Sequence, residues 1–117
     1  MAAIRIYHNP RCSKSRQTKA LLEDRDLALE VVEYLKDPPS VEELDGLCKA
    51  LNVEPLDITR TKEATFRDLG LSGADGRSRS EWLQLLHENP VLIERPIVVN
   101  GGKVAIGRPP ENVLGIL

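Results

Sequence analysis

The sequence predicts an α/β fold in which helices flank a mixed four-stranded sheet. A helical insertion lies between the two halves of the chain that form this sheet. Residues 3–35 read as strand, helix, strand, a unit that requires parallel pairing and a right-handed crossover. Residues 96–117 read as a two-stranded hairpin followed by a helix, which adds an antiparallel pair. A βαβ half and a ββα half can share one sheet, and the helix-rich segment between them then forms the insertion.

The first half of the predicted sheet comes from residues 3–35. Residues 3–7 alternate between apolar and polar side chains, which predicts a short first strand. Ser13 can cap the helix that follows, and we expect that helix to run to about Asp24. Residues 29–35 are rich in β-branched side chains and predict the second strand.

The insertion is predicted from two Ser-x-x-Glu capping boxes, each of which marks the N-terminus of a helix. They are Ser40 with Glu43 and Ser78 with Glu81. We expect the first of these helices to end at Asn52 and the second at Asn89-Pro90. Between them, residues 55–69 predict one or two short helices and residues 70–76 predict a turn-rich loop.

The second half of the sheet is predicted from residues 96–106, where two β-branched runs flank Asn100-Gly101-Gly102. This turn sequence is typical of an antiparallel hairpin. Residues 107–111 then start a last helix, because proline fits the first helical turn.

The order of these elements is that of a thioredoxin-like fold. A chain of 117 residues has the ordinary size of one domain, so we expect a single domain over residues 1–117. No apolar run approaches the roughly 20 residues that span a bilayer, and no signal-peptide pattern opens the chain, which favours a cytoplasmic location. The net charge of −2 gives no general attraction to nucleic acid or to a membrane of anionic lipid.

The two cysteines, Cys12 and Cys48, lie far apart and form no Cys-x-x-Cys pair, which argues against a disulfide scaffold or a zinc site. The two histidines, His8 and His87, give no metal-ligand spacing with these thiols, so we expect no metal site. Cys48 falls in an apolar helical stripe, and we interpret it as core packing rather than as a resolving thiol.

Cys12 lies where the apolar strand pattern gives way to a helical one. A helix N-terminus offers unpaired N–H groups and the positive end of a dipole, which favour a thiolate and attract an oxyanion. Cations are abundant and acids are missing before residue 21, the cations being Arg5, Arg11, Lys14, Arg16 and Lys19. We interpret Cys12 as a nucleophile beside an anion-binding turn. The alternative, a buried cysteine that packs as a small hydrophobe, fits poorly with these polar neighbours.

Three arginines stand at loop positions where they could hold the oxygens of an anion, namely Arg60, Arg95 and Arg108. Arginine suits this role because its planar guanidinium stays charged. Taken singly, each also fits an ordinary surface charge, and sequence spacing does not show that they converge. In a thioredoxin-like pattern the Arg95–Pro96 bond is a candidate cis peptide facing the thiol. His8 either tunes Cys12, as a cation or as a hydrogen-bond partner, or faces water at a strand end.

Four segments carry a more specific signal. They are Ile-Tyr-His-Asn-Pro-Arg-Cys-Ser-Lys-Ser-Arg from Ile6, Tyr-Leu-Lys-Asp-Pro-Pro from Tyr34, Glu-Arg-Pro-Ile-Val-Val from Glu94, and Ile-Gly-Arg-Pro-Pro-Glu from Ile106. Together they resemble the glutaredoxin-coupled arsenate reductase family over essentially the whole chain. The wording around Cys12 is most similar to a short subgroup of arsenate reductase-like proteins.

The resemblance implies a thioredoxin-like fold with a helical insertion, and reduction of arsenate to arsenite, with arsenate or a similar oxyanion as the bound substrate. By motif match, it implies that Cys12 is the nucleophile, that Arg60, Arg95 and Arg108 surround the anion, and that His8 and Ser15 support the thiolate. It also implies glutathione as co-substrate and glutaredoxin as protein partner, which agrees with the missing Cys-x-x-Cys pair. We expect no bound cofactor, and we expect a monomer.

Two alternatives stay open. The first is a thiol-disulfide oxidoreductase with another substrate, which would need Cys12 but would tolerate loss of Arg95 or Arg108. The second is a non-enzymatic, redox-responsive regulator of the same fold. Such regulators usually carry a Cys-x-x-Cys switch, whereas Asn9 and Ser15 occupy the positions three before and three after Cys12, which disfavours this alternative.

Overall fold

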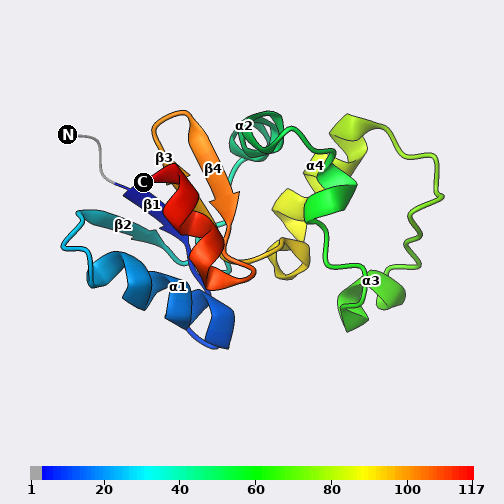
Figure 1. The fold of residues 1–117 in the computed structure, drawn as a ribbon. Coiled ribbons are helices and arrows are strands. Elements are labelled where there is room, and N and C mark those ends of the chain that lie inside the picture. Colours follow the sequence, from blue (N-terminus) through cyan, green and yellow to red (C-terminus); the bar gives the residue numbers. More distant parts are fainter. Residues whose placement is uncertain (1–3) are drawn as a thin grey trace. The chain divides into compact units, whose positions relative to one another are not determined.

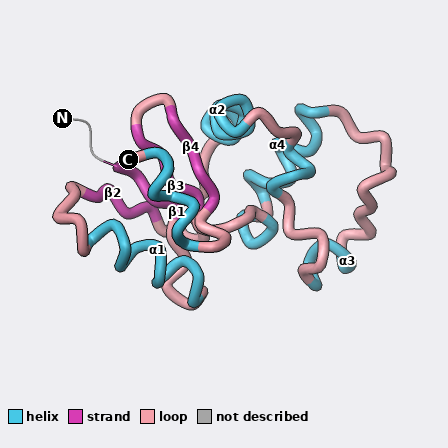
Figure 2. Tube along the Cα trace, viewed as in Figure 1, coloured by secondary structure: helices cyan, strands magenta, loops and turns pink. Residues whose placement is uncertain are grey.

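The computed structural model describes residues 4–117, which form two compact units (Figure 1). The sheet unit comprises the chain up to Asp37 together with Arg95–Leu117, and the insertion unit comprises Pro38–Glu94. Figure 2 shows that the strands all belong to the sheet unit, while the insertion unit consists of helices and loops. The predicted helical insertion is therefore a unit of its own. Ala3, which we predicted to open the first strand, lies outside the described residues.

The sheet unit contains the predicted mixed four-stranded sheet. Its strands are β1 (Ile4–Tyr7), β2 (Leu29–Val32), β3 (Ile97–Asn100) and β4 (Lys103–Ile106), in the order β2-β1-β3-β4. β1 pairs in parallel with β2 and antiparallel with β3, and β3 and β4 form the predicted antiparallel hairpin. Both halves of the thioredoxin-like fold thus share one sheet, and its central strands come from opposite ends of the chain.

The core of the sheet unit lies between the sheet and its helices. It contains Ile4 and Ile6 of β1, Leu22 of α1 (Ser13–Glu23), Val98 of β3, and Val113 of the C-terminal 3-10 helix η3 (Pro110–Ile116). Each of these side chains is buried, and removing apolar surface from water is the main stabilising contribution to such a fold.

Three element boundaries differ from the predictions. Cys12, rather than Ser13, is the N-cap of α1, because Cys12 closes a turn with Asn9 and has an extended backbone. β2 ends at Val32 rather than at residue 35, because the N–H groups of Lys36 and Asp37 donate to the carbonyl of Glu33 and form a turn.

The third difference concerns the last helix, which is a 3-10 helix rather than an α-helix. It has 7 residues, begins with Pro110 and contains Gly115 near its end. Gly115 lies in its last turn, and glycine disfavours an α-helix there.

The insertion unit is built on two capped helices, as predicted. α2 (Val41–Leu51) begins at the Ser40–Glu43 capping box, and α4 (Arg79–Glu88) begins at the Ser78–Glu81 box. Short elements connect and follow them, namely η1 (Pro55–Ile58), α3 (Ala64–Asp68) and η2 (Pro90–Leu92). The rings of Phe66 and Trp82 stack with centroids 6.4 Å apart, and both side chains are buried.

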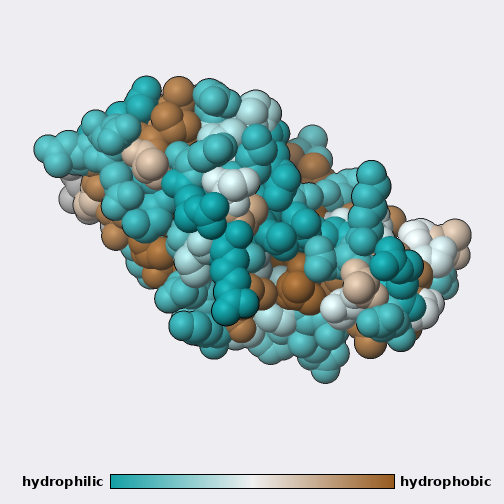
Figure 3. All heavy atoms as spheres, turned by 90° about the horizontal axis from the view of Figure 1, so that it is seen from below, coloured by the Kyte–Doolittle hydropathy of each residue, from teal (hydrophilic) through white to brown (hydrophobic). Residues whose placement is uncertain are grey.

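The surface is largely hydrophilic. Figure 3 shows one face on which polar side chains predominate and hydrophobic ones gather in separate patches. The exposed large hydrophobic residues are Val31, Leu35, Leu69 and Leu117. Within the described part of the chain, no helix has the length and apolar character needed to cross a membrane.

Gly107, which follows β4, gives a test of this packing. A Cβ atom there would lie 2.5 Å from Thr18 Oγ1 and 2.8 Å from Pro96 Cγ. Thr18 is fully buried and its hydroxyl donates to the Lys14 carbonyl, so it cannot move aside easily. We expect Gly107→Ala to lower the free energy of unfolding by about 1–3 kcal/mol in urea denaturation.

The matched control is Gly115→Ala, because a Cβ at Gly115 meets no atom within 4 Å. We expect that variant to unfold at the wild-type urea concentration or slightly above it. Equal stabilities of the two variants would contradict the close packing at Gly107.

Candidate functional site

Cys12 lies between β1 and α1, at the N-cap of the helix. Its N–H donates to the carbonyl of Asn9 over 3.0 Å, and its own carbonyl accepts from Arg16 over 3.0 Å, the first hydrogen bond of α1. The side chain is partly exposed. The backbone therefore holds the sulfur at the positive end of a helix while leaving it open to a reactant.

The environment of Cys12 favours the thiolate. Burial raises the pKa of the thiol, but hydrogen bonds from the backbone N–H groups of Ser15 and Lys14 and the guanidinium of Arg95 outweigh it, so the pKa lies below its usual value. A lowered pKa places more of the sulfur in its nucleophilic form at neutral pH.

Arg108 adds a second guanidinium at the same sulfur. Its Nη2 lies 3.8 Å from Cys12 Sγ, and its Nε donates to the carbonyl of Arg95 over 2.8 Å. The Arg95–Pro96 bond is cis, as predicted, and the Arg108–Pro109 bond is also cis, which we did not predict. The two arginines therefore converge on Cys12, which sequence spacing had not shown.

His8 and Ser15 form a buried pair beside this loop. The Nδ1 atom of His8 lies 2.6 Å from Ser15 Oγ, which also accepts the N–H of Asn9 over 3.0 Å. Burial lowers the pKa of His8, and the positive charges of Lys19 and Arg16 lower it further, against the acids Glu33 and Glu23. His8 is thus buried and paired with Ser15, so the alternative of a side chain facing water was wrong, and its burial disfavours the cation.

Arg60 belongs to the insertion unit, where two carboxylates hold its guanidinium. Its Nε lies 3.2 Å from Glu63 and its Nη1 lies 3.3 Å from Glu94. The backbone N–H of Arg60 also donates to the backbone carbonyl of Leu92 over 2.7 Å. The sheet unit brings together the other five predicted site residues, and the role of Arg60 stays a prediction.

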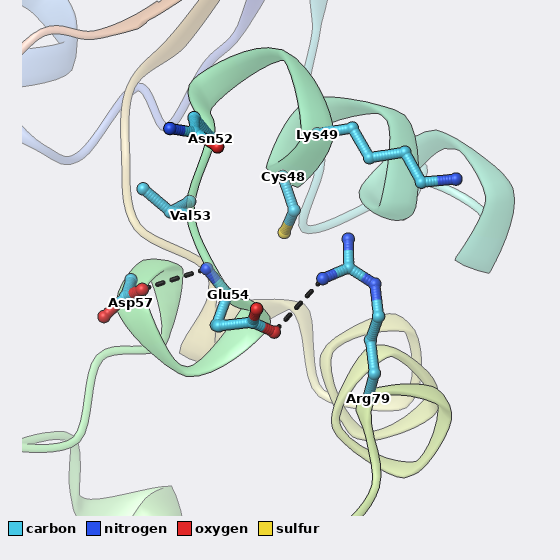
Figure 4. Close-up of a pocket in the computed structure, with 7 residues that line it drawn as sticks. All are labelled: Cys48, Lys49, Asn52, Val53, Glu54, Asp57 and Arg79. Carbon is cyan, nitrogen blue, oxygen red and sulfur yellow. Dashed lines mark hydrogen bonds and ion pairs between the residues drawn. The ribbon is translucent and has the colours of Figure 1, made fainter.

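Cys48 lines a cavity of about 380 Å³ within the insertion unit (Figure 4). Arg79, on the opposite wall, pairs with Glu54 over 3.2 Å and with Asp45 over 2.8 Å. The Cys48 side chain has no exposed surface, and burial raises the pKa of its thiol. This confirms the interpretation of Cys48 as core packing.

Sequence reasoning missed two polar residues at the site. Asn9 is buried and shapes the loop, because its Oδ1 accepts the N–H of Arg11 over 3.0 Å. Tyr34 is fully buried and adjoins Arg95 and Cys12. Tyr34 is the first residue of one of the four segments that resemble the arsenate reductase family. That position in the sequence could have pointed to it as a site residue. Among residues 4–117, no group of three or more His, Cys, Asp or Glu side chains could hold a metal ion.

The Arg95 contact predicts how the thiol titrates. Replacing Arg95 with Gln removes a positive charge that favours the thiolate, so the pKa of Cys12 should rise and the thiolate should form only at higher pH. The rate of iodoacetamide alkylation against pH, measured in a Cys48→Ala background, reports this midpoint. Arg25→Gln is the control, because Arg25 bonds to the Leu21 carbonyl near the other end of α1. Identical midpoints in both variants would rule out the Arg95 contribution.

Comparison of the chain with known proteins shows the family to which it belongs. A model of the ArsC family matches residues 7–116. An arsenate reductase of Haemophilus influenzae is 46% identical over 113 residues, covering 96% of this chain and 97% of that protein. Uncharacterized protein YfgD of Escherichia coli strain K12 is 44% identical, covering 97% of this chain and 96% of its own. The solved structure of an arsenate reductase from Vibrio cholerae has a TM-score of 0.93 and 47% identity, covering 98% of both chains. The chain therefore belongs to the ArsC family.

Proposed function

We propose that this protein reduces arsenate to arsenite with Cys12 as the nucleophile. The observation that carries the proposal is the sulfur environment: a helix N-terminus and two guanidinium groups meet at one partly exposed thiol. The same groups that favour the thiolate also attract a tetrahedral oxyanion, so nucleophile and substrate collect at one place. The relatives named arsenate reductase support arsenate as that oxyanion.

The reaction needs two electrons, which two thiols can supply. In the first step the Cys12 thiolate attacks arsenic, a sulfur–arsenic bond forms, and one arsenate oxygen leaves as water after protonation. A glutathione thiolate then attacks the Cys12 sulfur, so that a sulfur–sulfur bond forms as the sulfur–arsenic bond breaks. The electron pair of that broken bond stays on arsenic, which is released as arsenite, and two thiols have become one disulfide.

The arginines contribute charge at the step where oxygen departs. Arg95 and Arg108 each present a planar guanidinium, which can hold the anion's oxygens electrostatically and through paired N–H donors. Ser15 anchors the loop through Asn9 and His8, which keeps the N–H groups of α1 aimed at the sulfur. We include Arg60 as a third anion ligand on the resemblance alone.

External thiols complete the cycle in this proposal. The chain has two cysteines, and the second, Cys48, is fully buried. The protein therefore lacks an accessible partner thiol of its own, which supports glutathione as co-substrate. Glutaredoxin would then take up the glutathionyl group from Cys12 and return the thiol.

The proposal predicts arsenite formation in an assay with arsenate, glutathione, glutaredoxin and an NADPH-coupled regenerating system. Cys12→Ser should abolish arsenite formation, because a hydroxyl at this position is not ionised and cannot form the sulfur–arsenic bond. Cys48→Ala is the matched control and should keep wild-type turnover, since the Cys48 thiol is buried.

Arsenite formation that persists in Cys12→Ser would refute the proposed nucleophile. If the wild type makes no arsenite but reduces a glutathionylated peptide through Cys12, the protein is instead a thiol-disulfide oxidoreductase. Loss of Arg95 or Arg108 should then leave peptide reduction largely intact at a pH where Cys12 is a thiolate, because no oxyanion has to be held.

A further inference from the structure

Arg108 is an exposed side chain whose terminal nitrogens lie beside the Cys12 sulfur. Its Nη2 atom is 3.8 Å from Cys12 Sγ, and its Nε donates to the carbonyl of Arg95 over 2.8 Å. Holding a long, exposed side chain in one such arrangement costs conformational entropy. The position of the guanidinium therefore depends on how firmly the main chain of residue 108 is held.

The main chain that follows Arg108 has few donors of its own. Residues 109 and 110 are both proline, which carries no N–H group. The N–H of Arg108 itself donates to the carbonyl of Ile106 over 2.9 Å, which restrains the residue on its N-terminal side. A donor for the carbonyl of Arg108 must come from farther along the chain.

Asn112 supplies that donor. Its side-chain Nδ2 donates to the carbonyl of Arg108 over 3.0 Å, and its backbone N–H donates to the carbonyl of Pro109, also over 3.0 Å. One residue thus holds two consecutive carbonyl groups. The next residue, Val113, is fully buried in the core of the sheet unit, so the backbone that carries Asn112 is anchored. Asn112 therefore connects the core to the loop that carries Arg108.

We propose that Asn112 is a positioning residue of the Cys12 site that acts through Arg108. Its amide holds the Arg108 carbonyl, while the carbonyls of Ile106 and Arg95 hold the N–H and Nε of the same arginine. With its main chain and Nε restrained, the planar guanidinium keeps its remaining nitrogens at the sulfur. This inference rests on the proposed function, because it concerns an arginine that holds the oxyanion there.

Two alkylating reagents measure the charge that Arg108 presents at the sulfur. Iodoacetate is an anion and iodoacetamide is neutral, and both react with the thiolate. The ratio of their rate constants at one pH cancels the ionised fraction of Cys12 and reports how strongly the site attracts an anion. The measurement uses the Cys48→Ala background, which leaves Cys12 as the one cysteine of the chain.

Arg108→Gln should lower the ratio of the iodoacetate rate to the iodoacetamide rate by roughly 2- to 5-fold, the size expected for a unit charge about 4 Å away in a water-like medium. Asn112→Ala should lower it in the same direction by a smaller factor, because the arginine keeps its charge but loses its fixed position. The double variant should match Arg108→Gln alone, since Asn112 acts through that residue. Asn112 is itself exposed, so its replacement leaves the core intact.

Asn100→Ala is the matched control. The Nδ2 of Asn100 donates to the carbonyl of Ile116 over 2.6 Å, so this residue also ties its side chain to a backbone carbonyl near the C-terminus. Ile116 is the last residue of η3, whereas Arg108 precedes that helix. Asn100→Ala should unfold at a lower urea concentration, because it breaks a hydrogen bond, and should keep the wild-type ratio of alkylation rates.

A lower ratio in Asn112→Ala, with no further fall in the double variant, supports the proposal. A wild-type ratio in Asn112→Ala or in Arg108→Gln overturns it, as does an equal fall in Asn100→Ala. A double variant whose ratio lies below that of Arg108→Gln also overturns it, because Asn112 would then act by another route.

The arsenite assay keeps this result separate from the proposed reaction, since the alkylation ratio needs no arsenate. A wild type that forms no arsenite, together with a lowered ratio in Asn112→Ala, would refute arsenate reduction and support the positioning role. A wild type that forms arsenite, together with an unchanged ratio and an unchanged KM for arsenate in Asn112→Ala, would support the reaction and refute the positioning role.

Discussion

The chemistry of the sheet unit depends on how the charge of a single sulfur atom, that of Cys12, is stabilised. Burial alone would keep Cys12 protonated, and the N-terminus of α1 together with Arg95 reverses that preference. The groups involved come from distant parts of the sequence: the loop after β1, the second residue before β3, and the second residue after β4. Pairing of β1 with β3 brings the first two together, and the β3–β4 hairpin returns the third to the same place. The topology of the sheet is thus the means by which the thiolate acquires its cations.

Local signals predicted most of the fold. The capping boxes at Ser40 and Ser78, and the turn at Asn100-Gly101, each involve residues that contact one another within a few positions. Such signals survive in any tertiary context. The errors arose where two local tendencies competed. Residues 33–35 continue the β-branched run of Val31 and Val32 with the aromatic Tyr34, yet hydrogen bonds to the Glu33 carbonyl close a turn there.

The candidate site was predictable in its residues but not in its geometry. Composition and position singled out Cys12, and motif resemblance supplied Arg95 and Arg108, but no spacing rule brings residues 12, 95 and 108 together. His8 illustrates the same limit: its lowered pKa follows from burial and from the charge of Lys19, which depends on how α1 packs. Tyr34 escaped notice because burial of a hydroxyl is a property of the folded chain alone.

The burial of Cys48 has a consequence for how the protein behaves inside a thiol-buffered environment. An enzyme with two accessible cysteines can store its oxidised form as an internal disulfide until a reductant reacts with it. Here the second sulfur, that of Cys48, is buried in the insertion unit. An oxidised Cys12 therefore cannot form an internal disulfide with it. Each turnover in the proposed reaction must therefore be completed by thiols from outside the chain. The throughput of the protein would follow the ratio of reduced to oxidised thiols around it, and a fall in that ratio would stop the reaction before substrate ran out.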